Sequence, residues 1–168
     1  MKNKYVLLAV STLVIVIIDQ LTKHLIVSGF QYGESVDVIS NIFNITYVRN
    51  PGAAFGIFRT MDSSIRDGFF LLMPPAAMTV IFFMLKSTHE SEKIRKISLC
   101  AIFAGALGNY IDRIRFGYVV DFLDFHYHDK WVYPAFNVAD ISIVCGVSVL
   151  IILEILLMKQ EWLEKKVA

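Results

Sequence analysis

Apolar side chains are concentrated in four long stretches of the chain, and most polar side chains lie between them. The stretches cover residues 5–27, 69–85, 97–111 and 136–158. A helix needs about 20 mostly apolar residues to cross a hydrocarbon core about 30 Å thick, and each stretch is near that length, although the third is short. The pattern predicts a mainly α-helical membrane protein with four transmembrane helices, in a single domain over residues 1–168.

The composition indicates that the bilayer is the solvent. Of the 168 residues, 56% are hydrophobic and only 18% are charged, which is too apolar for an ordinary soluble domain. Lys2 and Lys4 followed by an apolar run resemble a secretory signal. However, the run reaches Asp19 and Gln20 without a small-x-small cleavage site, so we expect an uncleaved first helix.

Lysine and arginine residues predict the orientation of the chain, because they are enriched on the cytoplasmic side of membrane helices. They precede the first stretch, flank the connection between the second and third, and follow the fourth: Lys2, Lys4, Lys86, Lys93, Arg95, Lys96, Lys159, Lys165 and Lys166. Both termini are therefore expected in the cytoplasm. Residues 28–68 and 112–135 are expected outside.

The first outer segment is expected to contain a small extracytoplasmic β element. Residues 34–39 and 43–48 are rich in β-branched and aromatic side chains, and Ser40 and Asn41 between them are typical of a turn. A hairpin on its own is only marginally stable. We therefore expect this one to lie on the membrane surface or against the helices.

Two aspartates occur at the outer boundary of the last predicted helix. Asp121 falls in the second outer loop and Asp140 falls about one turn into the fourth stretch, so both can occupy the same depth. An ionisable side chain costs roughly 2.5 to 3.5 kcal/mol at the centre of a bilayer and usually marks function. The loop can fold Asp121 back onto Asp140.

Two carboxyl groups in hydrogen-bonding range cannot both ionise easily, so the pair acquires one low and one raised apparent pKa. The ionised member can then deprotonate water while the protonated member polarises a peptide carbonyl. Asp121 and Asp140 are therefore candidates for a catalytic pair. The alternative is a loop aspartate and a helix-start aspartate favoured by the helix dipole.

Four further polar side chains are expected at the same depth and can donate to a peptide carbonyl: Asn50, Asn109, Arg113 and Asn137. Asn109 and Arg113 are four residues apart on one helical face, so together they could hold an extended chain against the aspartates. Each asparagine is also typical of a cap or a turn.

Other charges inside the apolar stretches suggest structural pairing. Asp19 and Lys23 form an i, i+4 pair that would neutralise both groups in a low dielectric, and Asp112 beside Arg113 is expected to do the same.

The sequence favours neither a metal nor another cofactor. His126 and His128 lie near Asp124 and Asp129, but no third and fourth ligands are suitably spaced, so exposed loop residues are expected. Cys100 and Cys145 show no metal or redox spacing and are expected to be packing residues with free thiols.

Several other functions lose support. A net charge of +1 without a basic run argues against a nucleic-acid partner. No Gly-x-Ser-x-Gly, Walker or His-Glu-x-x-His motif occurs.

The main alternative is a proton-coupled membrane transporter, or an accessory subunit, with Asp19 and Asp140 as a relay. Such a relay should extend through the bilayer, whereas these polar residues gather near one face. A purely structural assembly protein is the third possibility.

Five blocks of residues occur in order along nearly the whole chain: Asp19-Gln20-Leu21-Thr22-Lys23, Asn50-Pro51-Gly52-Ala53-Ala54-Phe55-Gly56, residues 105–113 (GALGNYIDR), Val119-Val120-Asp121-Phe122 and Phe136-Asn137-Val138-Ala139-Asp140. Together these blocks resemble the lipoprotein signal peptidases (signal peptidase II), a family of bacterial membrane aspartic peptidases. Pro51 stands where the family often has threonine or serine.

The resemblance implies an endopeptidase of the bacterial inner membrane, with its active site near the extracytoplasmic face. It would cut diacylglyceryl-modified prolipoproteins on the amino side of the lipidated cysteine, with Asp121 and Asp140 as the catalytic dyad. Asn50, Asn109, Arg113 and Asn137 would bind substrate, and supporting roles would fall to Asp19, Lys23, Gly52 and Asp112. Membrane lipid and globomycin-type cyclic peptide inhibitors are the other expected partners.

Overall fold

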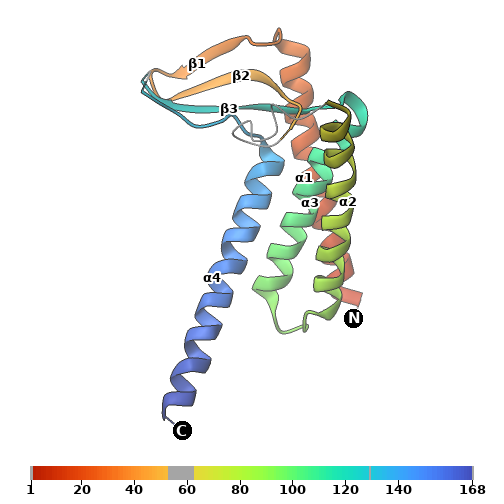
Figure 1. The fold of residues 1–168 in the computed structure, drawn as a ribbon, viewed down its shortest axis with the longest axis vertical. Coiled ribbons are helices and arrows are strands. Elements are labelled where there is room, and N and C mark those ends of the chain that lie inside the picture. Colours follow the sequence, from red (N-terminus) through yellow and green to blue (C-terminus); the bar gives the residue numbers. More distant parts are fainter. Residues whose placement is uncertain (1, 53–62, 129, 168) are drawn as a thin grey trace.

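Four long helices and a small antiparallel sheet make up the protein. The computed structural model describes residues 2–52, 63–128 and 130–167. In chain order the elements are α1 (Lys2–Gly29), β1 (Ser35–Ile39), β2 (Phe43–Asn50), α2 (Ser63–Ser87), α3 (Lys93–Phe116), β3 (Val119–Tyr127), β4 (Trp131–Val132) and α4 (Val138–Val167). The sheet lies across one end of the helices, and both chain termini lie at the opposite end (Figure 1).

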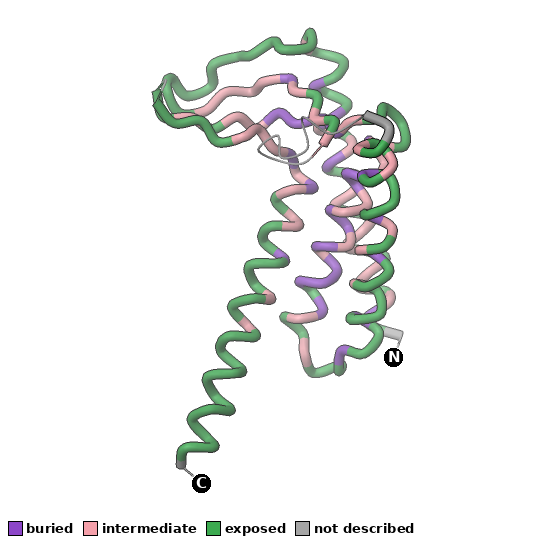
Figure 2. Tube along the Cα trace, viewed as in Figure 1, coloured by how far each residue is buried: buried purple, intermediate pink, exposed green. Residues whose placement is uncertain are grey.

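All four helices are long and apolar enough to cross a membrane by length and composition. In the most apolar part of α1 and of α4, only 6% of the residues are buried inside the protein. Large apolar side chains such as Leu13, Leu25 and Ile155 are exposed on these helices. Figure 2 shows that most of the length of α4 is exposed. Exposed apolar surface on this scale is expected where lipid is the solvent.

Helix α3 is the centre of the bundle, because α1, α2 and α4 all pack against it. Its small residues allow close approach. A Cβ atom on Gly105 would overlap the carbonyl oxygen of Ala139 in α4, and one on Gly108 would lie 2.8 Å from Asp19 Oδ2 in α1. The helix ends at Gly117, whose φ of 76° is the left-handed conformation that glycine adopts at helix ends.

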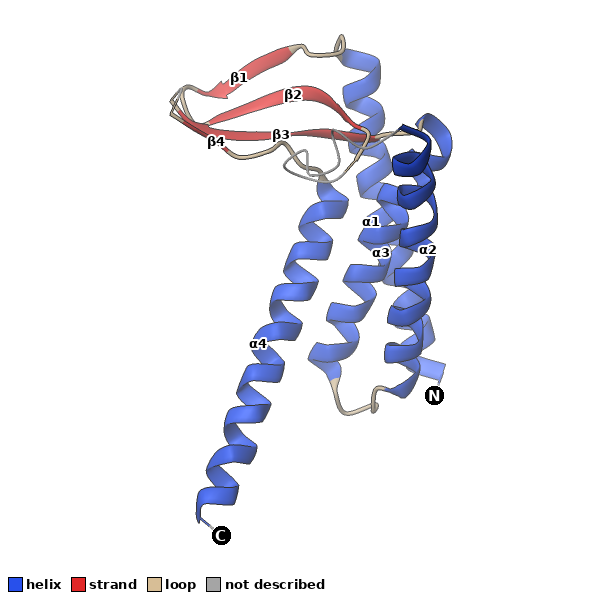
Figure 3. Ribbon diagram, in the orientation of Figure 1, coloured by secondary structure: helices blue, strands red, loops and turns tan. Residues whose placement is uncertain are grey.

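The expected β hairpin is present but belongs to a larger sheet. Strand order is β1-β2-β3-β4, with each neighbouring pair antiparallel (Figure 3). In the β1–β2 hairpin Ser35 pairs with Thr46, and Asn41 in the turn has a φ of 65°. Ser35, Asn44 and Thr46 then hydrogen-bond through their side chains, and Thr46 also donates to Asp124 of β3.

The prediction of a loop around Asp121 was wrong, because this residue lies within strand β3. Val119 and Val120 suit a strand, but the strand forms by pairing with β2, about 70 residues earlier in the chain. Such a pairing depends on the folded helices that bring the two segments together. The sequence pattern alone did not reveal it.

Candidate active site

Asp121 and Asp140 come from different elements and meet at the junction of the sheet and the bundle. Asp121 lies opposite Val48 in the β2–β3 ladder and is only 2% exposed. Asp140 lies in the first turn of α4 and is partly buried.

One side chain, Asn137, contacts both aspartates. Its Nδ2 donates to Asp121 Oδ1 at 2.7 Å and to the Val120 carbonyl at 3.2 Å. Its Oδ1 accepts from the Asp140 backbone N–H at 2.9 Å, and Asp140 Oδ2 accepts from the Asn137 N–H at 3.2 Å. This reciprocal pair is a capping box at the start of α4. Asn137 therefore begins the helix together with Asp140 and also links Asp140 to Asp121.

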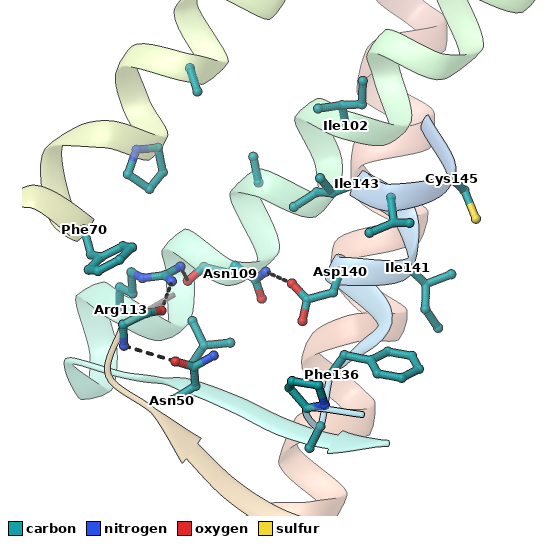
Figure 4. A pocket seen from close by; sticks show the side chains of 18 of the residues that line it. Asn50, Phe70, Ile102, Asn109, Arg113, Phe136, Asp140, Ile141, Ile143 and Cys145 are labelled. Atoms are coloured by element: carbon teal, nitrogen blue, oxygen red, sulfur yellow. Dashed lines mark hydrogen bonds between the residues drawn. The ribbon is translucent and has the colours of Figure 1, made fainter. Parts of the chain in front are cut away.

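Each aspartate also accepts a hydrogen bond from a second asparagine. Asn50 Nδ2, at the end of β2, donates to Asp121 Oδ2 at 3.0 Å. Asn109 Nδ2, in α3, donates to Asp140 Oδ1 at 2.7 Å, and Figure 4 shows these two side chains pointing toward one another. Asn50 Oδ1 also accepts from the Gly52 N–H, so this asparagine forms a turn as well. Residues 53–56 of the same motif lie outside the described residues.

Arg113 lies beside this group, one turn along α3 from Asn109. Its guanidinium lies over the ring of Phe70 at 5.2 Å and donates to the carbonyl oxygens of Gly52 and Asn109. Its Nε is buried and has no hydrogen-bond partner within the described part of the chain. Phe70 carried no signal in the sequence, since a phenylalanine in an apolar helix is ordinary.

A buried ion cluster lies behind Asn109. The expected pair is confirmed, with Lys23 Nζ at 2.9 Å from Asp19 Oδ2. The expected pairing of Asp112 with Arg113 was wrong, because adjacent residues on a helix point in different directions. Asp112 instead binds Lys23 Nζ at 3.0 Å and accepts from Gln20 Nε2 at 2.9 Å. Gln20 is a partner that the sequence reasoning missed, although a polar residue inside an apolar helix was the available signal.

A cavity of about 880 Å³ opens beside these residues, between the sheet and helices α2, α3 and α4. Asn50, Asn109, Arg113 and Asp140 line its polar end, and side chains such as Ile102 and Ile143 line the rest (Figure 4). Asp121 is not among the lining residues. It adjoins the cavity through Asn50, which contacts it.

Burial raises the pKa of Asp121 to about 7, and the nearby charge of Asp140 adds to this increase. The hydrogen bonds from Asn50 and Asn137 and the charge of Lys23 act in the opposite direction. A carboxyl group with this pKa exchanges a proton near neutral pH, as acid–base chemistry requires.

The described residues include no group of three histidine, cysteine, aspartate or glutamate side chains placed to hold a metal ion. Asp129, near the His126 and His128 pair, lies outside the described residues.

The chain matches the family model described as signal peptidase (SPase) II over residues 11–156. The chain belongs to the signal peptidase II family. It is 44% identical over 142 residues to the lipoprotein signal peptidase of Desulforapulum autotrophicum, covering 84% of this chain and 86% of that one. It is 41% identical over 152 residues to that of Syntrophus aciditrophicus, covering 90% and 94%.

Solved structures agree with this membership. Two are described as a bacterial membrane enzyme determined by the in meso method. One has a TM-score of 0.78 at 33% identity and covers 88% of this chain and 87% of its own. The other has a TM-score of 0.74 at 34% identity and covers 86% and 90%. This membership makes the protein a lipoprotein signal peptidase, and the alternative of a proton-coupled transporter finds no support.

Proposed function

We propose that Asp121 and Asp140 are the catalytic dyad of this peptidase. One observation carries the proposal: two carboxylates from separate elements contact the same asparagine, Asn137, at the edge of the large cavity. A helix cap at the start of α4 would need Asp140 but would not need Asp121. The convergence of a buried strand aspartate on the same asparagine is what acid–base hydrolysis by two carboxyl groups requires.

The mechanism uses one proton shared by the dyad. The ionised carboxylate takes a proton from water, the water attacks the scissile carbonyl carbon, and the protonated carboxyl donates a hydrogen bond to the carbonyl oxygen. Return of a proton to the leaving amine completes the cleavage. The raised pKa of Asp121, due to burial and to Asp140, favours a pair that holds one proton near neutral pH.

Polar residues around the dyad hold the substrate backbone. Arg113 Nε is a buried donor without a partner in the described part of the chain, so an incoming peptide carbonyl would satisfy it. Asn109 and Asn50 line the cavity beside it, and Asn137 orients both carboxylates. Gly52 supports Arg113 by accepting its hydrogen bond, and Asp19, Lys23 and Asp112 support the site from behind.

The substrate is a diacylglyceryl-modified prolipoprotein, cut on the amino side of its lipidated cysteine. The apolar part of the cavity, formed by residues such as Ile81, Ile102 and Val144, suits a lipid-bearing segment. Burial of acyl chains contributes about 0.8 kcal/mol per CH₂. Partition into the membrane therefore supplies most of the local substrate concentration, and the cavity needs to select mainly the lipid and small side chains.

The enzyme is a single domain in the bacterial inner membrane, with its active site near the extracytoplasmic face and both termini in the cytoplasm. The two termini lie at the end of the bundle away from the sheet, and Lys165 and Lys166 lie in the last turn of α4. This arrangement agrees with the cytoplasmic preference of basic residues.

The proposal is tested by incubating purified wild type, Asp121→Asn and Asp140→Asn with a diacylglyceryl-modified prolipoprotein in lipid or detergent. Thermal unfolding shows that each variant is folded. We expect cleavage by wild type and at least a 1,000-fold loss in both variants, because each removes one proton-transfer group. Near-normal turnover by either folded variant would exclude the dyad.

The matched control is Asp124→Asn, which removes a carboxylate from the same strand. Asp124 accepts from Thr46 and does not line the cavity, so turnover should remain within about twofold of wild type.

Unlipidated precursor should be cut far more slowly, and equal rates would refute the lipid requirement. A globomycin-type cyclic peptide should compete with substrate for the cavity, and noncompetitive inhibition would place it elsewhere.

A further inference from the structure

We propose that Lys23 is a positioning residue for both aspartates of the dyad. It binds two other carboxylates, and each of these accepts a hydrogen bond from the backbone N–H of the residue immediately before one aspartate of the dyad. The inference rests on the proposed dyad and adds a single shared support to it.

Lys23 is buried with three acceptors around its ammonium group. Nζ lies 2.9 Å from Asp19 Oδ2, 3.0 Å from Asp112 Oδ2 and 2.9 Å from Asn109 Oδ1. Its side chain is 3% exposed. An ammonium group has three N–H donors, so these contacts use its full capacity.

Asp19 connects Lys23 to the start of α4. Its second oxygen, Oδ1, accepts a hydrogen bond of 2.9 Å from the N–H of Ala139, the residue immediately before Asp140. The first N–H groups of a helix lack partners within the helix. Asp19 therefore satisfies one of them from a different helix, and in doing so fixes the first turn that carries Asp140.

Asp112 connects Lys23 to strand β3, through the same oxygen that contacts the lysine. Its Oδ2 accepts a hydrogen bond of 3.0 Å from the N–H of Val120, the residue immediately before Asp121. Val120 and Asp112 are both almost fully buried, at 0% and 1% exposure, so this bond is shielded from bulk solvent. The backbone that carries Asp121 is thus tied to the same cation.

A third connection runs through a side chain. Asn109 accepts from Lys23 with Oδ1 and donates with Nδ2 to Asp140 Oδ1, which fixes the amide in one orientation. Lys23 therefore acts on Asp140 through Asn109 and through the Asp19–Ala139 contact.

The charge of Lys23 should also influence the dyad. Among the described residues, the charged groups that face Asp121 and Asp140 are Lys23 from α1, Arg113 from α3 and the carboxylates of Asp19 and Asp112. Burial and the charge of Asp140 are the effects that raise the pKa of Asp121, and Lys23 lowers it. Loss of the Lys23 charge should therefore raise this pKa further, because the ionised form loses a nearby cation.

The test measures kcat, KM and their pH dependence for Lys23→Met, which preserves length and apolar volume but removes the charge. We expect kcat to fall at least 100-fold and the pH profile to move to higher pH by half a unit or more. A folded Lys23→Met with the wild-type pH profile and kcat would overturn the proposal.

The matched control is Lys4→Met in the same helix. Lys4 is also buried, and it donates to the carbonyl oxygens of Lys86 and Thr88 at the end of the bundle away from the sheet. Its loss should lower thermal stability while leaving the pH profile unchanged. A shifted pH profile in Lys4→Met would show that loss of any buried lysine has this effect, and would overturn the specific role of Lys23.

If Lys23→Met does not fold, Asp112→Asn provides a second test of the proposal. Asp112→Asn keeps the shape of the side chain and leaves Lys23 paired with Asp19, but weakens the link to Val120. Because Asp112 would position Asp121 without touching substrate, kcat should fall at least tenfold while KM stays within twofold. An unchanged kcat would overturn the proposal.

These outcomes are distinct from failure of the dyad itself. If Asp121→Asn or Asp140→Asn retains turnover, the proposed function is wrong regardless of Lys23. If both are inactive while folded Lys23→Met and Asp112→Asn behave as wild type, only the positioning role is wrong.

Discussion

At the scale of single residues, Asp140 combines two interpretations that the sequence presented as alternatives. It completes the capping box of α4 with Asn137, as a helix-start aspartate would. It also lines the cavity and contacts Asn109. The cap fixes the carboxylate in place, because its orientation is tied to the backbone of the first helical turn. A structural contact of this kind can therefore prepare a side chain for chemistry.

Asp121 leads to a prediction about stability and pH. Its pKa in the folded protein, raised to about 7 by burial and by Asp140, lies above the value of about 4 in an unfolded chain. Between these pH values the folded state binds the proton more tightly than the unfolded state. The contribution of Asp121 to the free energy of unfolding should therefore fall as pH rises from about 4 to 7, by a few kcal/mol at most.

Thermal unfolding of wild type and Asp121→Asn across this pH range checks the prediction. The variant cannot ionise at this position, so it should lose less stability between pH 4 and 7 than wild type. The difference in the free energy of unfolding, variant minus wild type, should therefore be larger at pH 7 than at pH 4. Parallel stability curves for the two proteins would contradict the raised pKa.

At the scale of elements, helix α3 brings the site together because its small residues let neighbours approach. The side of α3 that carries Gly105 and Gly108 meets the first turn of α4 and the Asp19 region of α1. Small residues on a membrane helix allow such close packing. The sequence did not indicate that this contact aligns Asp19 with the N–H of Ala139.

Gly105→Ala tests the need for this close approach. The new Cβ would overlap the Ala139 carbonyl and lie 2.8 Å from Ile143 Cγ1, so α4 would have to move away from α3. We expect a loss of about 1 to 3 kcal/mol in the free energy of unfolding, together with reduced turnover, because Asp140 would move with α4. Thermal unfolding and the cleavage assay measure both effects.

Gly68→Ala is the control for this substitution. Gly68 also lies within a helix, α2, but a Cβ there would meet nothing within 4 Å. It should leave turnover intact and stabilise the helix by up to about 1 kcal/mol. Equal effects of the two substitutions would show that α3–α4 contact is not the cause.

At the scale of the whole molecule, the sheet closes one end of the bundle and the site lies where the two meet. Strands β2 and β3 supply Asn50 and Asp121, while α3 and α4 supply Asn109 and Asp140. This places the polar cluster near one end of the apolar helices.

The orientation of the molecule can be measured with alkaline phosphatase fusions, which are active only outside the cytoplasm. We expect an active fusion after His128, next to the sheet, and inactive fusions after His89 and after Ala168. The basic residues at both termini and in the connection between α2 and α3 are the physical reason. An active fusion after Ala168 would place the C-terminus outside and contradict the proposed orientation.

The sequence by itself determined the four apolar helices, the β1–β2 hairpin and the Asp19–Lys23 pair, because each depends on residues close together in the chain. Family motifs also named the polar residues of the site. Only the tertiary structure made β3 a strand, paired Lys23 with Asp112 and placed Asn137 between the two aspartates. These features depend on contacts between segments far apart in sequence, and such contacts are decided by how the helices pack rather than by any local pattern.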